Sequence, residues 1–238
     1  DDRFGFDGHF TLLKCNFCDH KFLDNITDDF LNLIYENYYY RNNLDSTDIK
    51  KIKEKNNLFL WLTGNYYFAY RWVPKDVRVL DIGCGFGEAL IYHKNRGCEV
   101  FGVETGGESI KNLSDKYGLN IKIGFFDPNL YPENYFDYIT MDQVIEHIKN
   151  PLETLKGIRR ILKPTGKVII STPNPDGWGA AVFKNKYWNW HIPYHINQFS
   201  ILSMKVLAKR ANLILKKSKT ITLSNWILGQ IVHYLNFP

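Results

Sequence analysis

Three closely spaced glycines follow an apolar segment in the middle of the chain. Residues 79–82 run directly into Gly83, Gly85 and Gly87, and Glu88 opens a helical pattern. Glycine permits positive φ angles and lets the backbone approach a ligand without a Cβ in the way. Open α/β sheets bind nucleotides at the carboxyl ends of their strands, so this turn predicts a site for a nucleotide-like cofactor.

The spacing and charge of this turn disfavour a dinucleotide. The dinucleotide pattern G-x-G-x-x-G/A needs Gly or Ala where this chain has Glu88, and Gly87 comes one residue too early for it. An acidic side chain at a helix N-terminus suits the helix dipole but repels a phosphate. We therefore expect a cofactor with no phosphate and a positive or zwitterionic tail, such as S-adenosylmethionine; an NAD-dependent oxidoreductase is the rival interpretation.

Two carboxylates stand at the tips of the next two expected strands. Glu104 ends a strand over residues 99–104, where it can accept hydrogen bonds from both hydroxyls of a ribose. Asp127 follows a strand over residues 119–123 and is placed to accept from an adenine amino group, with Phe125 or Phe126 near the ring. Either acid alone is more often a polar loop residue, but their order along successive strands favours cofactor binding.

Histidines supply the candidate catalytic groups. If the cofactor is the sulfonium considered above, the expected reaction is methyl transfer, an in-line displacement in which much of the acceleration can come from positioning. A hydroxyl acceptor also needs a base, for which histidine is suited. His195 lies in an aromatic insertion where a lid over the acceptor is expected, and His147 follows Glu146 just beyond the fourth strand. We favour His195 and then His147 as base, the alternative being that Glu146 and His147 only fix a turn.

Metal ligands are sparse. A magnesium site from Asp142, Asn174 and Asp176 is conceivable but unsupported, so no catalytic metal is predicted. Cys15 and Cys18 have the spacing of a zinc knuckle, and His20 could be a third ligand, but a structural zinc ion needs four. The cysteine pair is therefore expected to be free or to be half of a zinc ribbon whose other half lies outside this chain.

The elements that position these residues alternate regularly from residue 77 onward. Short apolar strands alternating with helices predict an α/β fold with a Rossmann-like, doubly wound, mostly parallel sheet. Expected strands cover residues 77–82, 99–104, 119–123, 136–141, 167–172 and 213–223. Expected helices cover residues 88–96 and 109–117, one that starts at Asn150-Pro151 and is stopped by Pro164-Thr165-Gly166, and one capped by Ser200.

Residue composition and apolar patterning divide the chain into three parts. Residues 1–75 are aromatic and predict a helical cap, with helices starting near Thr27 or Asp28 and near residues 46–48 and an apolar stretch at 58–62. Residues 76–223 form the cofactor-binding domain, in which 173–198 is a lid-like insertion. Residues 224–238 are an apolar helix or arm, which could contact a membrane surface or pack against the core.

Composition limits the partners. The net charge of +5 comes from 30 basic and 25 acidic residues, too small and scattered an excess to predict a nucleic-acid partner. Four cysteines without a disulfide pattern, and no visible signal peptide, predict a cytoplasmic location. We expect one small-molecule acceptor.

Four segments, in their order along the chain, resemble the class I S-adenosylmethionine-dependent methyltransferases. They are VLDIGCGFGEAL, FGVE, FDYITMDQVIEHIKNP and ILKPTGKVIISTPN. The resemblance covers about residues 77–212 and is greatest to the branch with ubiquinone-biosynthesis and sugar methyltransferases. It implies that Asp81 and the three glycines wrap the methionine end, while Glu104 binds ribose and Asp127 adenine. The full implied cofactor set is Asp81, Gly83, Cys84, Gly85, Gly87, Glu104, Thr105, Phe126, Asp127, Met141 and Asp142.

The resemblance leaves the acceptor open. An O-methyltransferase acting on a sugar, lipid or phenolic hydroxyl is the favoured interpretation. The alternatives are N-methylation of an amino sugar or small amine, and a module that binds S-adenosylmethionine without catalysis. The family usually closes its sheet with a strand pair after the late helix, and the position of that last strand is uncertain here.

Overall fold

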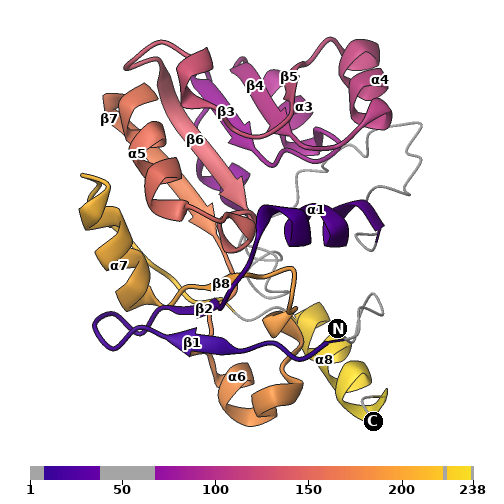
Figure 1. The fold of residues 1–238 in the computed structure, drawn as a ribbon. Helices are drawn as coiled ribbons and strands as arrows, with labels where there is room; N and C mark the ends of the chain where they lie inside the picture. Colours follow the sequence, from indigo (N-terminus) through magenta and orange to yellow (C-terminus); the bar gives the residue numbers. More distant parts are fainter. Residues whose placement is uncertain (1–7, 38–67, 222–223, 237–238) are drawn as a thin grey trace.

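The computed structural model describes residues 8–37, 68–221 and 224–236 (Figure 1). The helix expected at residues 46–48 and the apolar stretch at 58–62 lie outside the described residues.

The centre of the fold is a five-stranded sheet in the order β5-β4-β3-β6-β7. Its strands are β3 (Arg78–Ile82), β4 (Glu99–Glu104), β5 (Asn120–Ile123), β6 (Phe136–Asp142) and β7 (Leu162–Ser171). All neighbouring pairs are parallel. The carboxyl ends of the strands therefore meet at one edge, as the sequence predicts.

Helices cover both faces of this sheet. Successive residues of a strand point to opposite faces, and Val100 and Phe101 of β4 contact two different core clusters. The Phe101 cluster includes residues of α5 (Pro151–Ile161) and α7 (Ile201–Arg210), and the Val100 cluster includes residues of α3 (Glu88–Lys94) and α4 (Glu108–Tyr117). The doubly wound α/β prediction is confirmed.

The start of the fifth strand differs from the prediction. Helix α5 ends at Ile161 and β7 begins at Leu162, not at Lys167. Leu162 pairs with Phe136 and Lys167 pairs with Tyr138, so β7 uses five residue steps where β6 uses two. The Pro164-Thr165-Gly166 sequence forms this irregularity within the strand, because proline cannot donate to the sheet.

The N-terminal part is only partly helical. Thr27 caps α1 (Asp28–Asn37) by accepting a hydrogen bond of 3.1 Å from the Phe30 N–H, which confirms that helix start. The preceding residues form a hairpin of β1 (Leu12–Lys14) and β2 (Lys21–Leu23), which the sequence did not predict. Strand β2 also pairs with β8 (Asn197–Gln198), so the hairpin is joined to the end of the insertion (Figure 1).

The C-terminal part corrects one strand prediction and confirms one helix. Residues 213–221 contain no strand, and Ile214 is 83% exposed. An alternating apolar pattern needs a partner strand, and this segment pairs with none in the described residues. Helix α8 (Ser224–Asn236) follows and lies beside α6 (Trp178–Phe183), with the Phe183 and Tyr234 rings 5.6 Å apart (Figure 1).

Among the described helices, none has the length and apolar character required to cross a bilayer.

Candidate functional site

The glycine turn adopts the conformation that its composition predicts. The φ angles are +73° at Gly83, +56° at Gly85 and +88° at Gly87, which precedes the first residue of α3. A Cβ on Gly83 would lie 2.4 Å from a methyl group of Val144. The missing side chain therefore lets the turn pack against Val144, in the loop that follows β6.

Glu104 reaches over the glycine turn. Its Oε2 accepts a hydrogen bond of 2.7 Å from the Gly85 N–H, and its Oε1 accepts one of 2.8 Å from the Thr105 N–H. A carboxylate has about four lone-pair sites, so both oxygens can accept further hydrogen bonds. The carboxylate is thus held at the strand tip where the sequence places a ribose partner, and the Thr105 residue beside it is exposed.

Asp81 is buried beneath the turn. Its carboxyl accepts a hydrogen bond of 2.6 Å from the Thr140 hydroxyl of the neighbouring strand. Burial raises the pKa of Asp81 to about 7, and the charges of Asp142 and Glu104 add to the rise. A cationic ligand at this edge would reduce that repulsion, which fits the ammonium or sulfonium group of the expected cofactor.

The side chains of the other residues expected at the methionine end are mainly in contact with the protein itself. Asp142 accepts hydrogen bonds of 2.8 Å from the Ala69 N–H and one from the Ser171 hydroxyl, and burial raises its pKa. Met141 is fully buried in the core and Cys84 is 6% exposed. The Met141 side chain therefore packs inside the sheet layers, so its backbone is the part available to a ligand.

The adenine side is more open. Asp127 is exposed and accepts a hydrogen bond of 2.9 Å from the Asn129 N–H, which caps the short helix η3 (Pro128–Leu130). Phe125 is 83% exposed, whereas Phe126 packs partly against the core. Phe126 is thus the ring that the fold holds in place beside Asp127.

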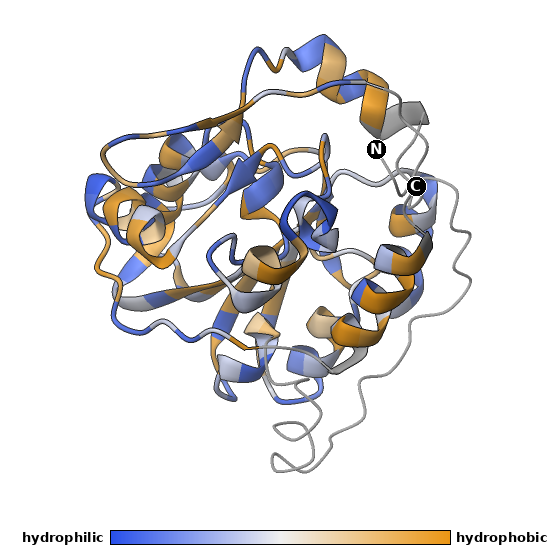
Figure 2. Cartoon of the chain, turned by 90° about the horizontal axis from the view of Figure 1, so that it is seen from below, coloured by the Kyte–Doolittle hydropathy of each residue, from blue (hydrophilic) through white to orange (hydrophobic). Residues whose placement is uncertain are grey.

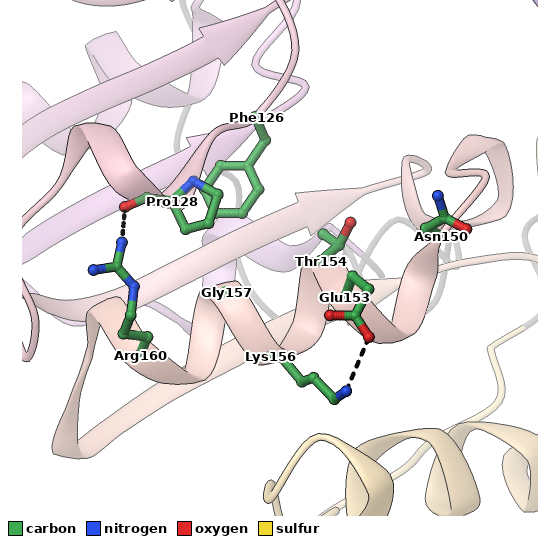
Figure 3. A pocket seen from close by; sticks show the side chains of 8 residues that line it. All are labelled: Phe126, Pro128, Asn150, Glu153, Thr154, Lys156, Gly157 and Arg160. Carbon is green, nitrogen blue, oxygen red and sulfur yellow. Dashed lines mark hydrogen bonds and ion pairs between the residues drawn. The ribbon is translucent and has the colours of Figure 1, made fainter. Parts of the chain in front are cut away.

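A surface groove lies next to this loop, between η3 and α5 (Figure 3). Arg160 donates to the Pro128 carbonyl across it, and Lys156 pairs with Glu153 at 2.9 Å. Its lining includes Phe126 but none of Glu104, His147 and His195. The groove therefore adjoins the expected adenine side at Phe126 but does not include the ribose carboxylate or the candidate catalytic histidines.

The structure brings His147 and His195 together although they are 48 positions apart in the sequence. Their rings are 4.8 Å apart at the centroids. The Nδ1 of His147 contacts the Tyr194 carbonyl at 2.8 Å, and the Nδ1 of His195 contacts the Asn189 carbonyl at 3.0 Å. The sequence indicates each of these histidines as a candidate base, and the structure places the two side by side.

Glu146 completes this cluster, and the sequence indicated only a turn-fixing role for it. Its side chain is 1% exposed in η4 (Ile145–His147), and Oε2 accepts a hydrogen bond of 3.0 Å from the Thr172 hydroxyl. Burial raises the pKa of Glu146 to about 8. In the sequence, the Glu146-His147 pair directly after a strand was the only indication of a role for Glu146. The burial of the carboxyl could not be predicted, because it depends on residues 173–198 folding over it.

Cys15 and Cys18 lie in the turn of the N-terminal hairpin. Hydrogen bonds from the backbone of Phe17 and Cys18 lower the pKa of the Cys15 thiol. Both cysteines are free, and the third ligand considered, His20, instead contacts the Asn197 side chain at 3.0 Å through Nε2. The described part of the chain thus supplies a knuckle of two thiols.

Comparison with known proteins identifies the family. Residues 50–217 match the family described as "Methyltransferase domain". The chain therefore belongs to this family, and its parallel sheet makes it a class I member, the class that uses S-adenosylmethionine as cofactor.

Individual relatives are more distant. The chain is 31% identical over 133 residues to an uncharacterized protein of Methanocaldococcus jannaschii, covering 56% of this chain and 57% of the relative. It is 35% identical over 116 residues to the ubiquinone biosynthesis O-methyltransferase of Coxiella burnetii, covering 45% and 48%. The chain thus spans about half the length of these curated relatives.

A solved structure shows the same fold. It is a chain from the complex between the Haloferax volcanii Trm112 methyltransferase activator and a methyltransferase, with a TM-score of 0.57 and 23% identity. The match covers 69% of this chain and 74% of that chain.

Proposed function

We propose that the chain transfers a methyl group from S-adenosylmethionine to a hydroxyl of a small sugar, lipid or phenolic acceptor. The observation that supports this most is the position of Glu104, whose carboxylate lies against the glycine turn at 2.7 Å from Gly85. In this proposal Glu104 binds the ribose, Asp127 the adenine amino group, and the turn with Asp81 the methionine end. The cofactor's methyl group then faces the loops after β6 and β7.

Activation of the acceptor hydroxyl is assigned to the two histidines, with the buried His195 first and the partly buried His147 second. Both rings are held through Nδ1 by backbone carbonyls, which fixes their orientation. Val144, which touches the glycine turn, directly precedes the helical turn carrying His147. This short connection supports an acceptor site between the cofactor and the insertion.

The test uses S-adenosylmethionine labelled with ¹³C in the methyl group. The chain is incubated with matched pairs of acceptors, a hexose and its amino sugar, and a phenol and its aniline. We expect S-adenosylhomocysteine to form with the hydroxyl partner and the product's ¹³C resonance to lie in the O-methyl region. Methylation of the amine partner alone would establish the N-methyl alternative, and cofactor binding without turnover of any acceptor would favour the non-catalytic one.

We also propose a peripheral membrane contact through α8, which would suit a lipid-like acceptor. Figure 2 shows apolar residues along this helix near the C-terminus. The exposed apolar residues are Leu228, Ile231, Val232 and Leu235 on α8 and Trp178 and Val182 on α6. The Lys186 ammonium group lies 5.3 Å from the Tyr234 ring beside them. An apolar helix face flanked by a basic residue is typical of binding at the surface of anionic lipid.

A further inference from the structure

One carboxylate and two imidazoles form a cluster between two segments that are far apart in the sequence. Glu146 and His147 belong to η4, after β6, and His195 lies at the end of the 173–198 insertion. Each of the three residues has a potential ligand atom within 4.8 Å of those of the other two. Glu146 is 1% exposed and His195 is 6% exposed, whereas His147 is partly buried, so the cluster is reached from solvent on the His147 side only.

We propose that Glu146, His147 and His195 bind a divalent transition-metal ion, for which Zn²⁺ is the best match. Imidazole nitrogen suits zinc and its neighbours in the first transition row, whereas Mg²⁺ and Ca²⁺ prefer sites made of oxygen. Two ligands of one tetrahedral zinc ion lie about 3.4 Å apart, so the ligand atoms that are farthest from one another need to approach by up to about 1.4 Å. Three protein ligands also leave a coordination position for another molecule, as in catalytic zinc sites.

A second observation, independent of the spacing, concerns the Glu146 carboxyl. Its Oε2 accepts from the Thr172 hydroxyl, but its Oε1 is buried and has no hydrogen-bond partner among the described residues. A buried polar atom without a partner costs about 1–3 kcal/mol, and such atoms are uncommon in folded proteins. A metal ion bound at the cluster would satisfy this oxygen.

The hydrogen bonds of the two histidines agree with this role. A backbone carbonyl can only accept, so Nδ1 of His147 and of His195 carries the proton and Nε2 carries the lone pair. Metal-binding histidines are usually oriented in this way by a carbonyl or carboxylate on the other nitrogen. The Nε2 of His195 lies at hydrogen-bond distance, 3.3 Å, from the Nδ1 of His191, so an ion bound at Nε2 would take the place of that contact.

The consequence for catalysis rests on the proposed function. The acceptor hydroxyl would bind at the fourth position, where the ion lowers the pKa of that hydroxyl. Its proton passes to water, the oxygen lone pair forms a bond to the methyl carbon, and the carbon–sulfur bond breaks to give S-adenosylhomocysteine. In this arrangement His195 acts as a ligand, and the metal ion takes the place of a histidine base.

The test measures metal binding directly, in a chain from which the thiols of the Cys15–Cys18 pair have been removed. Cys15→Ser and Cys18→Ser exclude the knuckle, and the protein is then stripped with a chelator and titrated with Zn²⁺ by calorimetry. We expect one ion per chain. Glu146→Gln and His195→Gln should each weaken Zn²⁺ binding by more than about 100-fold, because even outer-shell partners contribute 10- to 100-fold. The control is His9→Gln, an exposed histidine outside the cluster, which should leave the affinity unchanged.

Titration with Co²⁺ gives a second readout. A visible absorption band without sulfur-to-metal charge transfer is expected, and it should be absent in Glu146→Gln. No ion uptake by the doubly substituted chain, or equal Zn²⁺ affinity in Glu146→Gln, would overturn the metal site. The two proposals fail separately: metal uptake without methyl transfer removes only the proposed function, and methyl transfer by a chain that takes up no metal removes only the metal site.

Discussion

Glu104 provides the sharpest test of the cofactor assignment by substitution. The proposal gives its carboxylate two additional hydrogen bonds from the ribose, and a hydrogen bond to a charged group contributes about 1.5–3 kcal/mol. Glu104→Ala should therefore cost about 3–6 kcal/mol of S-adenosylmethionine binding. Since 1.4 kcal/mol corresponds to a tenfold change, the dissociation constant should rise by about 10²- to 10⁴-fold.

Glu104→Gln should have a smaller effect than Glu104→Ala. Its amide oxygen can still accept from the Gly85 N–H, which preserves the turn, while one ribose bond is lost. We expect the dissociation constant to rise by about 10- to 100-fold. The matched control is Glu99→Gln, at the opposite end of the same strand, where the carboxylate is half-exposed and pairs with Arg78. It should leave cofactor binding unchanged.

The assay is isothermal titration calorimetry with S-adenosylmethionine, accompanied by thermal unfolding of each variant to confirm folding. A folded Glu104→Ala variant that binds the cofactor as tightly as the parent chain would refute the ribose assignment.

Three further predictions concern the histidines and α8. His195→Ala should lower turnover by at least about 10²-fold while leaving cofactor affinity intact, as measured by product formation and calorimetry; full activity would exclude it from acceptor activation. His93 is fully buried, and burial lowers its pKa to about 4. The imidazole therefore stays neutral in the folded chain at pH 5, whereas in the unfolded chain it takes up a proton as the pH falls below about 6.5. Urea unfolding should show a loss of about 2 kcal/mol from this residue between pH 7 and pH 5, and a His93→Gln variant with the same pH dependence as the parent would contradict this. Removing residues 224–238 should abolish co-sedimentation with anionic liposomes; undiminished binding would place the lipid contact elsewhere.

The sheet could be predicted from sequence because its signals are local. Buried parallel strands appear as short apolar runs, and the breaks between them carry glycine or proline, so the bounds of β4 over Glu99–Glu104 match the expectation. Polar residues directly after these runs had to lie at one edge, which placed Glu104 near the glycine turn.

The parts that could not be predicted depend on contacts between distant segments. The strands β1 and β2 have three residues each, too few for an alternating pattern, and β2 is completed by β8, which lies far along the chain at Asn197–Gln198. The burial of Glu146 likewise requires the insertion that carries His195 to fold back over η4. Residues 213–221 show the opposite case, an apolar alternation without a neighbouring strand to pair with.

The most direct test of the central claim is a crystal structure of the chain grown with S-adenosylhomocysteine. The proposal predicts the adenosyl group at the carboxyl edge of the sheet, with its ribose hydroxyls within hydrogen-bond distance of the Glu104 carboxylate and its amino-acid end beside Gly83 and Gly85. The nucleoside bound at another surface, or a Glu104 carboxylate that contacts neither ribose hydroxyl in the saturated crystal, would contradict it.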